Sequence, residues 1–165
     1  MTTGVMLVEV DDHVAGEVLG TIAPTRTFAG GFPRDDDRQA IEGRERGALA
    51  FLVVDDGVVV GTCGTHGPPS HEGAIELGWG LVVGARGRGV GSAAVSQLLA
   101  DVTARCPAAT VIAHTEWRVD EGTLVADSPA SEAILRRLGF VADDVPTAPG
   151  ERAWRLERPA AVPTS

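Results

Sequence analysis

The sequence predicts an α+β fold, with one mainly antiparallel sheet and helices on both of its faces. Asp55-Asp56-Gly57 separates two runs of β-branched residues, 48–54 and 58–63, which is typical of a tight β-hairpin. Apolar residues recur with a period near 3.6 over 90–105, which predicts an amphipathic helix. The predicted order of elements, βααβββαβαββ, lacks the regular alternation of a parallel α/β sheet.

The segments before the hairpin predict one strand, two helices and a loop rich in Gly, Pro and Thr. The second helix has acids early and arginines late, which suits the helix dipole. The expected elements are a strand over 5–10, a helix from Asp11 or Asp12 to Leu19, a loop over 21–33 and a helix over 35–46.

After the hairpin, Ser128-Pro129 opens a helix as N-cap and first helical residue, and Gly139 closes it. The other expected elements are strands over 74–83, 110–114, 140–141 and 152–157, the helix over 90–105 and a polar connection over 115–127. We expect a single domain over 1–158 and a flexible tail over 159–165.

Composition narrows the class of protein. A chain of 165 residues, 44% hydrophobic, is long enough for one domain with a core, and no apolar run reaches the roughly 20 residues of a membrane span. The net charge of −9 argues against nucleic acid as a partner and is compatible with a cationic substrate. Cys63 and Cys106 are expected to be free thiols. With no evident signal peptide, we expect a cytoplasmic protein with no membrane partner.

A glycine-rich hexapeptide, Arg86-Gly87-Arg88-Gly89-Val90-Gly91, stands where a strand passes into a helix. Consecutive backbone N–H groups at a helix N-terminus bind anions, and the two arginines can add charge-assisted bonds to phosphate. A diphosphate is the natural ligand, although such turns also simply join elements. The spacing excludes the P-loop, which needs Gly-Lys-Ser/Thr, and the Rossmann Gly-x-Gly-x-x-Gly.

The segment 81–91 resembles the acetyl-CoA signature of the GNAT (Gcn5-related) N-acetyltransferase superfamily, Arg/Gln-x-x-Gly-x-Gly/Ala, with Arg86, Gly89 and Gly91 at the fixed positions. A second segment, 128–140, resembles the family's Asn-x-x-Ser…Leu-Gly-Phe, with Ser131 and Leu138-Gly139-Phe140 matching. Ser128 stands where the family usually has asparagine, which puts one hydrogen bond to pantetheine in doubt. Residues 76–81 lean toward the branch that acetylates ribosomal-protein N-termini and small amines.

This resemblance implies a sheet splayed at the CoA site and a direct transfer of acetyl from acetyl-CoA to a primary amine of a small molecule or peptide. The backbone of the strand end would bind pantetheine, and the loop amides would bind the pyrophosphate. The cofactor-binding residues that it implies are Leu81, Val82, Val83, Arg86, Gly87, Arg88, Gly89, Val90, Gly91, Ser92, Ser128 and Ser131.

For the chemistry, the resemblance points to Glu76 as the base, although this carboxylate could equally orient substrate or pair with an arginine. The family's usual acid, a tyrosine, is missing, since the chain contains none. Ser131 is the candidate to interact with the sulfur, and His114 is a second candidate base. The residues expected to line the acceptor pocket are Phe28, Phe32, Trp79 and His114.

No metal is expected, because His66, His71 and Glu72 are poorly spaced as ligands. Family habit makes a homodimer possible. The missing tyrosine and Ser128 also support an alternative, a CoA-binding regulatory or degenerate domain without turnover.

Overall fold

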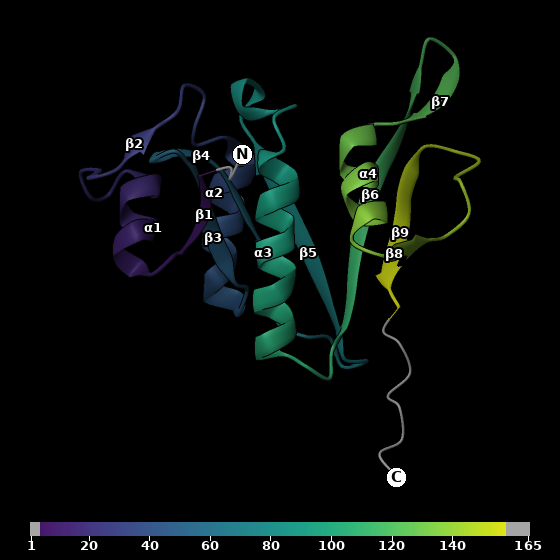
Figure 1. The fold of residues 1–165 in the computed structure, drawn as a ribbon, viewed down its shortest axis with the longest axis horizontal. Helices are drawn as coiled ribbons and strands as arrows, with labels where there is room; N and C mark the ends of the chain where they lie inside the picture. The colour runs from purple at the N-terminus through teal and green to yellow at the C-terminus, as the bar shows by residue number, and fades with distance from the viewer. Residues whose placement is uncertain (1–3, 158–165) are drawn as a thin grey trace. The chain divides into compact units, whose positions relative to one another are not determined.

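The computed structural model describes residues 4–157, which contain four α-helices and nine strands (Figure 1). The chain forms two compact units, which divide between Ala109 and Thr110. Within each unit the strands pair antiparallel, except for one parallel pair in the first unit. The predicted α+β class is confirmed. The expected tail at 159–165 lies outside the described residues, and one domain over 1–158 stays a prediction.

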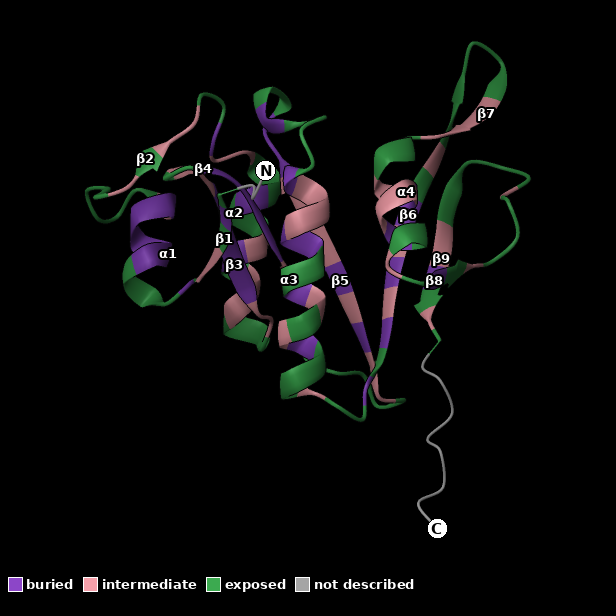
Figure 2. Ribbon diagram, viewed as in Figure 1, coloured by how far each residue is buried: buried purple, intermediate pink, exposed green. Residues whose placement is uncertain are grey.

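The sheet of the first unit has an inner strand, β3 (Ala50–Asp55), that is buried up to its last residue. The hydrogen-bonded order of this sheet is β1 (Val5–Glu9), β3, β4 (Val58–Thr65) and β5 (Ala74–Leu81). Leu52 and Val53 on β3 are completely inaccessible to solvent, as a continuous apolar run covered on both faces should be. Figure 2 colours much of β3 as buried. The β3–β4 turn has Asp56 and Gly57 at positive φ, which a tight hairpin with right-handed strands requires.

Helices cover both faces of this sheet (Figure 1). The helices of the first unit are α1 (Asp12–Leu19), α2 (Asp35–Glu42) and α3 (Val90–Arg105). Asp37 of α2 accepts a hydrogen bond from Thr62 of β4. The next residue, Cys63, points to the other face, where it lies in the field of Asp101 of α3.

Two expected boundaries in this unit are wrong. The loop predicted over 21–33 contains the short strand β2 (Thr27–Phe28), which runs parallel to the first residues of β4. The helix predicted over 35–46 ends at Glu42, and Gly43–Arg46 form a tighter 3-10 turn that Gly47 closes in a left-handed conformation. Glycine at 43 and 47 favours such an end, whereas the charge pattern alone continues to Arg46.

The second unit is an antiparallel sheet of four strands with one helix, α4 (Pro129–Arg137). Its strands, in hydrogen-bonded order, are β7 (Thr123–Ala126), β6 (Thr110–Asp120), β9 (Gly150–Leu156) and β8 (Phe140–Ala142). Ser128 caps α4 by accepting a bond from the Ser131 amide, and Pro129 is the first helical residue, as predicted. Trp154, 1% exposed, is a core residue.

The polar connection predicted over 115–127 is wrong. Strand β6 continues to Asp120, turns at Glu121 and Gly122, and returns as β7. Both turn residues have positive φ, as a two-residue hairpin needs, but glutamate is rarely found in that conformation. The turn therefore lacks the usual Asn-Gly or Asp-Gly signal.

Candidate active site

The loop between β5 and α3 is held to the end of β5 by a side-chain bond. Strand β5 ends at Leu81, two residues before the predicted end, and the 3-10 turn Val83–Ala85 follows. Arg86 folds back over this turn, and its Nε donates to the Leu81 carbonyl oxygen at 3.2 Å. The Arg86 side chain, which the sequence suggests as a phosphate ligand, therefore holds the loop to the end of the strand.

Two glycines shape the rest of the loop. Gly87 and Gly89 have φ of 76° and 80°, and a Cβ at either position would meet no atom within 4 Å. Gly89 is the N-cap of α3 and provides no side chain to cap the helix. The first N–H groups of α3, from Val90 onward, are therefore not satisfied by a capping side chain. A left-handed glycine loop that opens a helix in this way fits a phosphate group.

Arg88 lies at the same loop but has a partner. Its Nη2 is 3.1 Å from Oδ2 of Asp55, the last residue of β3. The arginine side chain is 56% exposed and the aspartate only 10%. An anion that binds Arg88 would therefore replace the Asp55 carboxylate as its partner or bind the guanidinium together with it.

Glu76 stands on β5, half-buried, and it makes an interaction of its own. Because side chains alternate along a strand, Glu76 shares its face of β5 with Gly78 and Gly80. Neighbouring side chains occupy the space above both glycines: the His66 imidazole lies against Gly78, and the Arg34 guanidinium lies against Gly80. The face that carries the candidate base is thus covered by two basic side chains from other segments.

The three aromatic residues expected at the acceptor pocket differ in their position and in how far they are buried. Trp79 pairs in register with Cys63, so it lies on the face of β5 opposite to Glu76. Phe28 and Phe32 pack edge to face, with ring centroids 5.1 Å apart, and Phe32 is only 8% exposed. Phe32 is therefore a core residue, and of this pair only Phe28 has substantial exposed surface.

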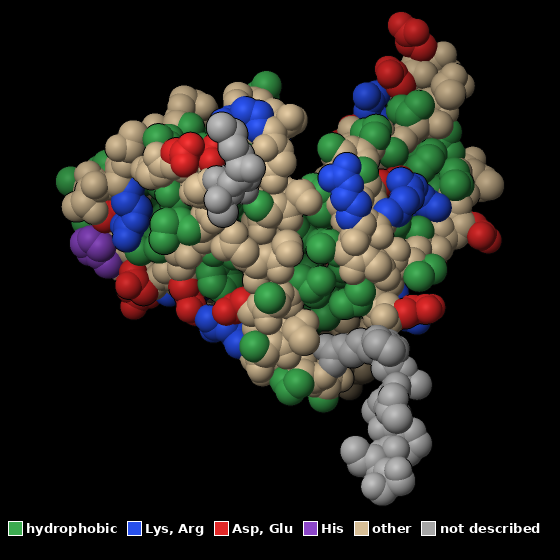
Figure 3. Space-filling model, in the orientation of Figure 1, with side chains coloured by type: hydrophobic (Ala, Val, Ile, Leu, Met, Phe, Trp, Pro, Cys, Tyr) green, Lys and Arg blue, Asp and Glu red, His purple; other side chains and the backbone are tan. Residues whose placement is uncertain are grey.

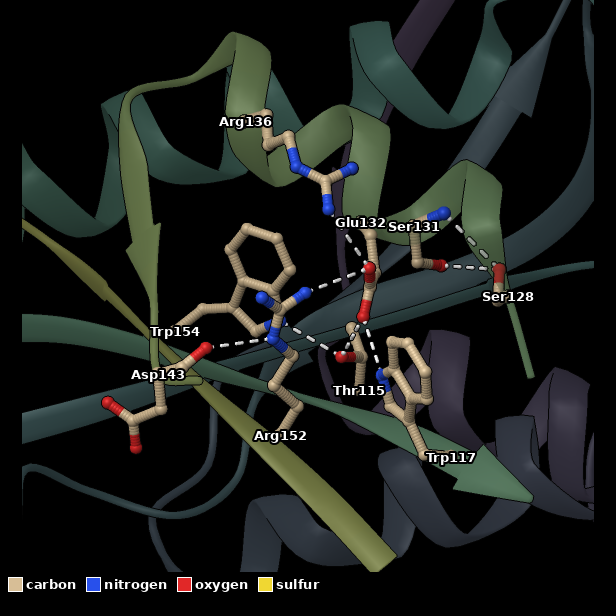
Figure 4. A network of polar contacts seen from close by, with 9 residues as sticks. All are labelled: Thr115, Trp117, Ser128, Ser131, Glu132, Arg136, Asp143, Arg152 and Trp154. Carbon is tan, nitrogen blue, oxygen red and sulfur yellow. Dashed lines mark hydrogen bonds and ion pairs between the residues drawn. The ribbon is translucent and has the colours of Figure 1, made fainter. Parts of the chain in front are cut away.

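In the second unit, a buried carboxylate organises a polar network (Figure 4). Glu132, 4% exposed, receives bonds on Oε1 from Thr115 Oγ1 at 3.1 Å and from Trp117 Nε1 at 2.8 Å. Its Oε2 receives one Nη bond each, at 3.2 Å, from Arg136 and Arg152. The charge of Glu132 is thus balanced inside the protein rather than by water.

Arg152 joins this network to the rest of the unit. Its Nε donates to the Asp143 carbonyl oxygen, and its guanidinium lies 5.0 Å from the ring centroid of Trp154. Figure 3 shows basic side chains gathered over α4 and β9. Sequence reasoning missed this network, and the one local signal was the i,i+4 pair of Glu132 and Arg136.

The two predicted serines lie beside the network and contact each other. The Ser128 hydroxyl donates to Ser131 Oγ at 2.9 Å while it caps α4. His114 lies on β6 opposite Ala153, at an open pocket of about 710 Å³ whose lining includes Asp143 and Glu151. The loop residues and Glu76 belong to the first unit, whereas Ser128, Ser131 and His114 belong to the second.

Residues 4–157 contain no cluster of three or more His, Cys, Asp or Glu side chains able to hold a metal ion. None of the helices in this range is long and apolar enough to cross a membrane. Both cysteines are free thiols, as predicted. Burial raises the pKa of the Cys63 thiol to about 12, so this cysteine is not a nucleophile.

Comparison with known proteins adds to these observations. A family model described as "Acetyltransferase (GNAT) domain" matches residues 10–141, most of the chain. Two solved structures share the fold. One is an acetyltransferase from Agrobacterium tumefaciens str. C58, with 19% identity and a TM-score of 0.56, and the match covers 96% of this chain and 94% of that one. The other is the ribosomal L7/L12 α-N-protein acetyltransferase RimL in complex with coenzyme A, with 17% identity and a TM-score of 0.60, and the match covers 94% of this chain and 93% of that one. No curated protein matches the chain.

Proposed function

The chain belongs to the GNAT acetyltransferase family, and from this premise we propose that it transfers an acetyl group from acetyl-CoA to a primary amine of a small molecule or peptide. The observation that carries the proposal is the loop of left-handed glycines, which leaves the first amides of α3 without a capping side chain. That geometry supports binding of the cofactor's pyrophosphate by residues 86–92.

Acetyl-CoA supplies the acetyl group as an activated thioester. Leu81, Val82 and Val83 would hold the pantetheine arm through their backbone, next to the phosphate-binding loop. Ser128 and Ser131 are proposed to contribute further polar contacts from α4. The Arg86 bond to the Leu81 carbonyl oxygen fixes the end of β5 relative to the loop. Because this oxygen and the Val82 N–H already have partners within the chain, the arm would bind other backbone groups of the segment.

Glu76 is proposed to accept the proton that an ammonium group must lose before its nitrogen can attack. The carboxylate stands on the strand that leads to the loop, five residues before Leu81. Ser131 is proposed to hold a proton for the leaving sulfur, since the chain contains no tyrosine. The Ser131 oxygen already receives a bond from Ser128, which leaves its own O–H to donate elsewhere.

Release of free CoA thiol from acetyl-CoA, measured with a thiol reagent across a panel of primary amines, tests the proposed reaction. We expect amine-dependent release, and a broad panel without release would contradict the activity. Glu76→Gln should lower kcat by about 10²–10⁴-fold, because general-base catalysis contributes that much, while CoA affinity stays within about twofold. The matched control is Glu72→Gln, an exposed carboxylate just before β5, which should leave kcat unchanged. An unaltered rate in Glu76→Gln would remove this residue from the mechanism.

A second candidate, a CoA-binding domain without turnover, is favoured by one specific observation, the absence of any tyrosine to serve as the acid. It predicts tight CoA binding with no acetyl transfer. We further propose that the protein works in the cytoplasm and forms a homodimer, which sedimentation at working concentrations would test.

A further inference from the structure

Arg34 is an exceptionally well-fixed cation in the first unit. Its Nε and Nη2 donate to the two carboxylate oxygens of Asp37 at 2.9 and 2.8 Å. The Asp37 side chain is completely buried, and Thr62 of β4 donates to it at 2.6 Å. A guanidinium held by two parallel bonds to a buried carboxylate keeps one orientation.

That orientation places the guanidinium on the strand that carries Glu76. A Cβ at Gly80 would stand 2.8 Å from Nη1 and 2.9 Å from Cζ of Arg34, which is closer than real contacts allow. Gly80 precedes Leu81, where the proposed cofactor-binding segment begins, and it shares a face with Glu76. Gly31, from the same loop as Arg34, lies near Val82, since a Cβ there would be in ordinary contact with the Val82 side chain at 3.9 Å.

The guanidinium has binding capacity left. Of its five N–H donors, two bind Asp37, and the other three have no partner among the described residues. The side chain as a whole remains 26% exposed. Guanidinium groups match the geometry of carboxylates, and a second carboxylate can bind the free edge.

We propose that Arg34 binds a carboxylate of the acceptor, so that the preferred acceptors are primary amines that also carry a carboxylate. The inference rests on the proposed acetyltransferase function. From Glu76 to Gly80 the strand rises by about 13 Å, and the His66 imidazole lies over Gly78 between them. Amine and carboxylate in the acceptor are therefore separated by several bonds, as in a short peptide or a long ω-amino acid.

A matched set of acceptors tests this proposal. Each amine is assayed as its carboxylic acid and as the corresponding amide, which has nearly the same shape but no charge. For the wild type we expect kcat/KM to be at least about tenfold higher for the acid, the range of a charge-assisted hydrogen bond. Equal values for acid and amide would overturn the proposal.

Arg34→Gln should reduce the ratio of kcat/KM for the acid to kcat/KM for the amide to about one. This variant leaves the buried Asp37 without its ionic partner, however, and can fail to fold. Gly80→Ala keeps both charges and places a methyl group where the guanidinium lies; because Nη2 of that group also binds Asp37, the free energy of unfolding of this variant is measured beside its kinetics. It should also abolish the preference for the acid while CoA affinity stays unchanged. A preference retained in Gly80→Ala would overturn the assignment of Arg34.

Gly30→Ala is the control, since Gly30 lies in the loop before Arg34 and a Cβ there would meet no atom within 4 Å. This variant should keep the wild-type ratio of kcat/KM for the acid to kcat/KM for the amide. Failure of the proposed function gives a different result, because then neither the acids nor the amides are acetylated. Acetylation of both at equal rates rejects only the role of Arg34.

Discussion

The two cysteines of this chain differ in their surroundings. Cys63 is 2% exposed on β4, and burial, reinforced by the charge of Asp101, raises the pKa of its thiol to about 12. Cys106 follows α3 and is partly exposed. Because the thiolate is the reactive form, Cys63 should resist alkylation in the native protein.

We therefore expect iodoacetamide at pH 8.5 to label Cys106 and leave Cys63 unmodified until the protein is unfolded, as mass spectrometry of peptides would show. The folded state raises the pKa of Cys63, so its neutral form stabilises the fold. This contribution is complete below the unfolded pKa near 9 and is lost as the pH rises toward 12. Rapid labelling of native Cys63 would contradict this description of the strand.

Other residues show what sequence can and cannot predict at this scale. The conformations of Gly87 and Gly89 could be expected, because glycine adopts positive φ at little cost. The direction of Arg86 could not, since its charge suggests a phosphate ligand while its Nε actually binds the Leu81 carbonyl oxygen. The sequence tells which group is present and not which partner it finds.

Helix α4 is joined to its sheet by the carboxylate of Glu132. Replacement by alanine leaves Arg152, whose side chain is 10% exposed, without its ionic partner. We expect Glu132→Ala to lower the free energy of unfolding by about 3–5 kcal/mol, the usual cost of breaking a buried ion pair. Denaturant titration would measure it.

Arg137→Ala, at an exposed position of the same helix, is the control and should change stability by less than about 0.5 kcal/mol. A loss of that small size in Glu132→Ala would show that the network does not stabilise the unit. The network could not be predicted because its members come from three elements far apart in sequence. The β6–β7 hairpin was missed for a different reason, since Glu121 is an unusual residue at positive φ.

At the scale of the whole molecule, the net charge of −9 opposes the approach of a phosphate-rich cofactor. Arg88, one of the two exposed arginines of the loop, offsets this field locally. Arg88→Ala should therefore weaken CoA binding by about tenfold near 20 mM salt, and by much less near 300 mM, where charges are screened within several Å. Titration calorimetry would measure the ratio of the CoA dissociation constants of the variant and the wild type at each salt concentration.

Arg137→Ala also removes one positive charge, but it lies away from the loop in sequence and should leave CoA affinity unchanged at both concentrations. If the effect of Arg88→Ala were independent of salt, the arginine would act by direct contact instead of by its field.

The fold class was predictable because it depends on repeated local patterns, such as the hairpin at Asp56-Gly57 and the apolar period of α3. The segments that form the loop and the capped α4 were predictable for the same reason. The surroundings of Arg34 were not, because they depend on contacts such as Asp37 with Thr62, which join different elements. Burial of Phe32 shows the same limit, since an aromatic residue in a glycine-rich loop gives no indication of what covers it.

The bond from Arg86 to the Leu81 carbonyl oxygen has a thermodynamic consequence. Glycine-rich segments lose more conformational entropy than others when a ligand orders them. Here the protein has already restricted the end of the strand and the start of the loop with its own side chain and two backbone bonds. For the proposed cofactor, part of the entropic cost of binding would thus be met during folding, and more of the contact energy would remain as affinity.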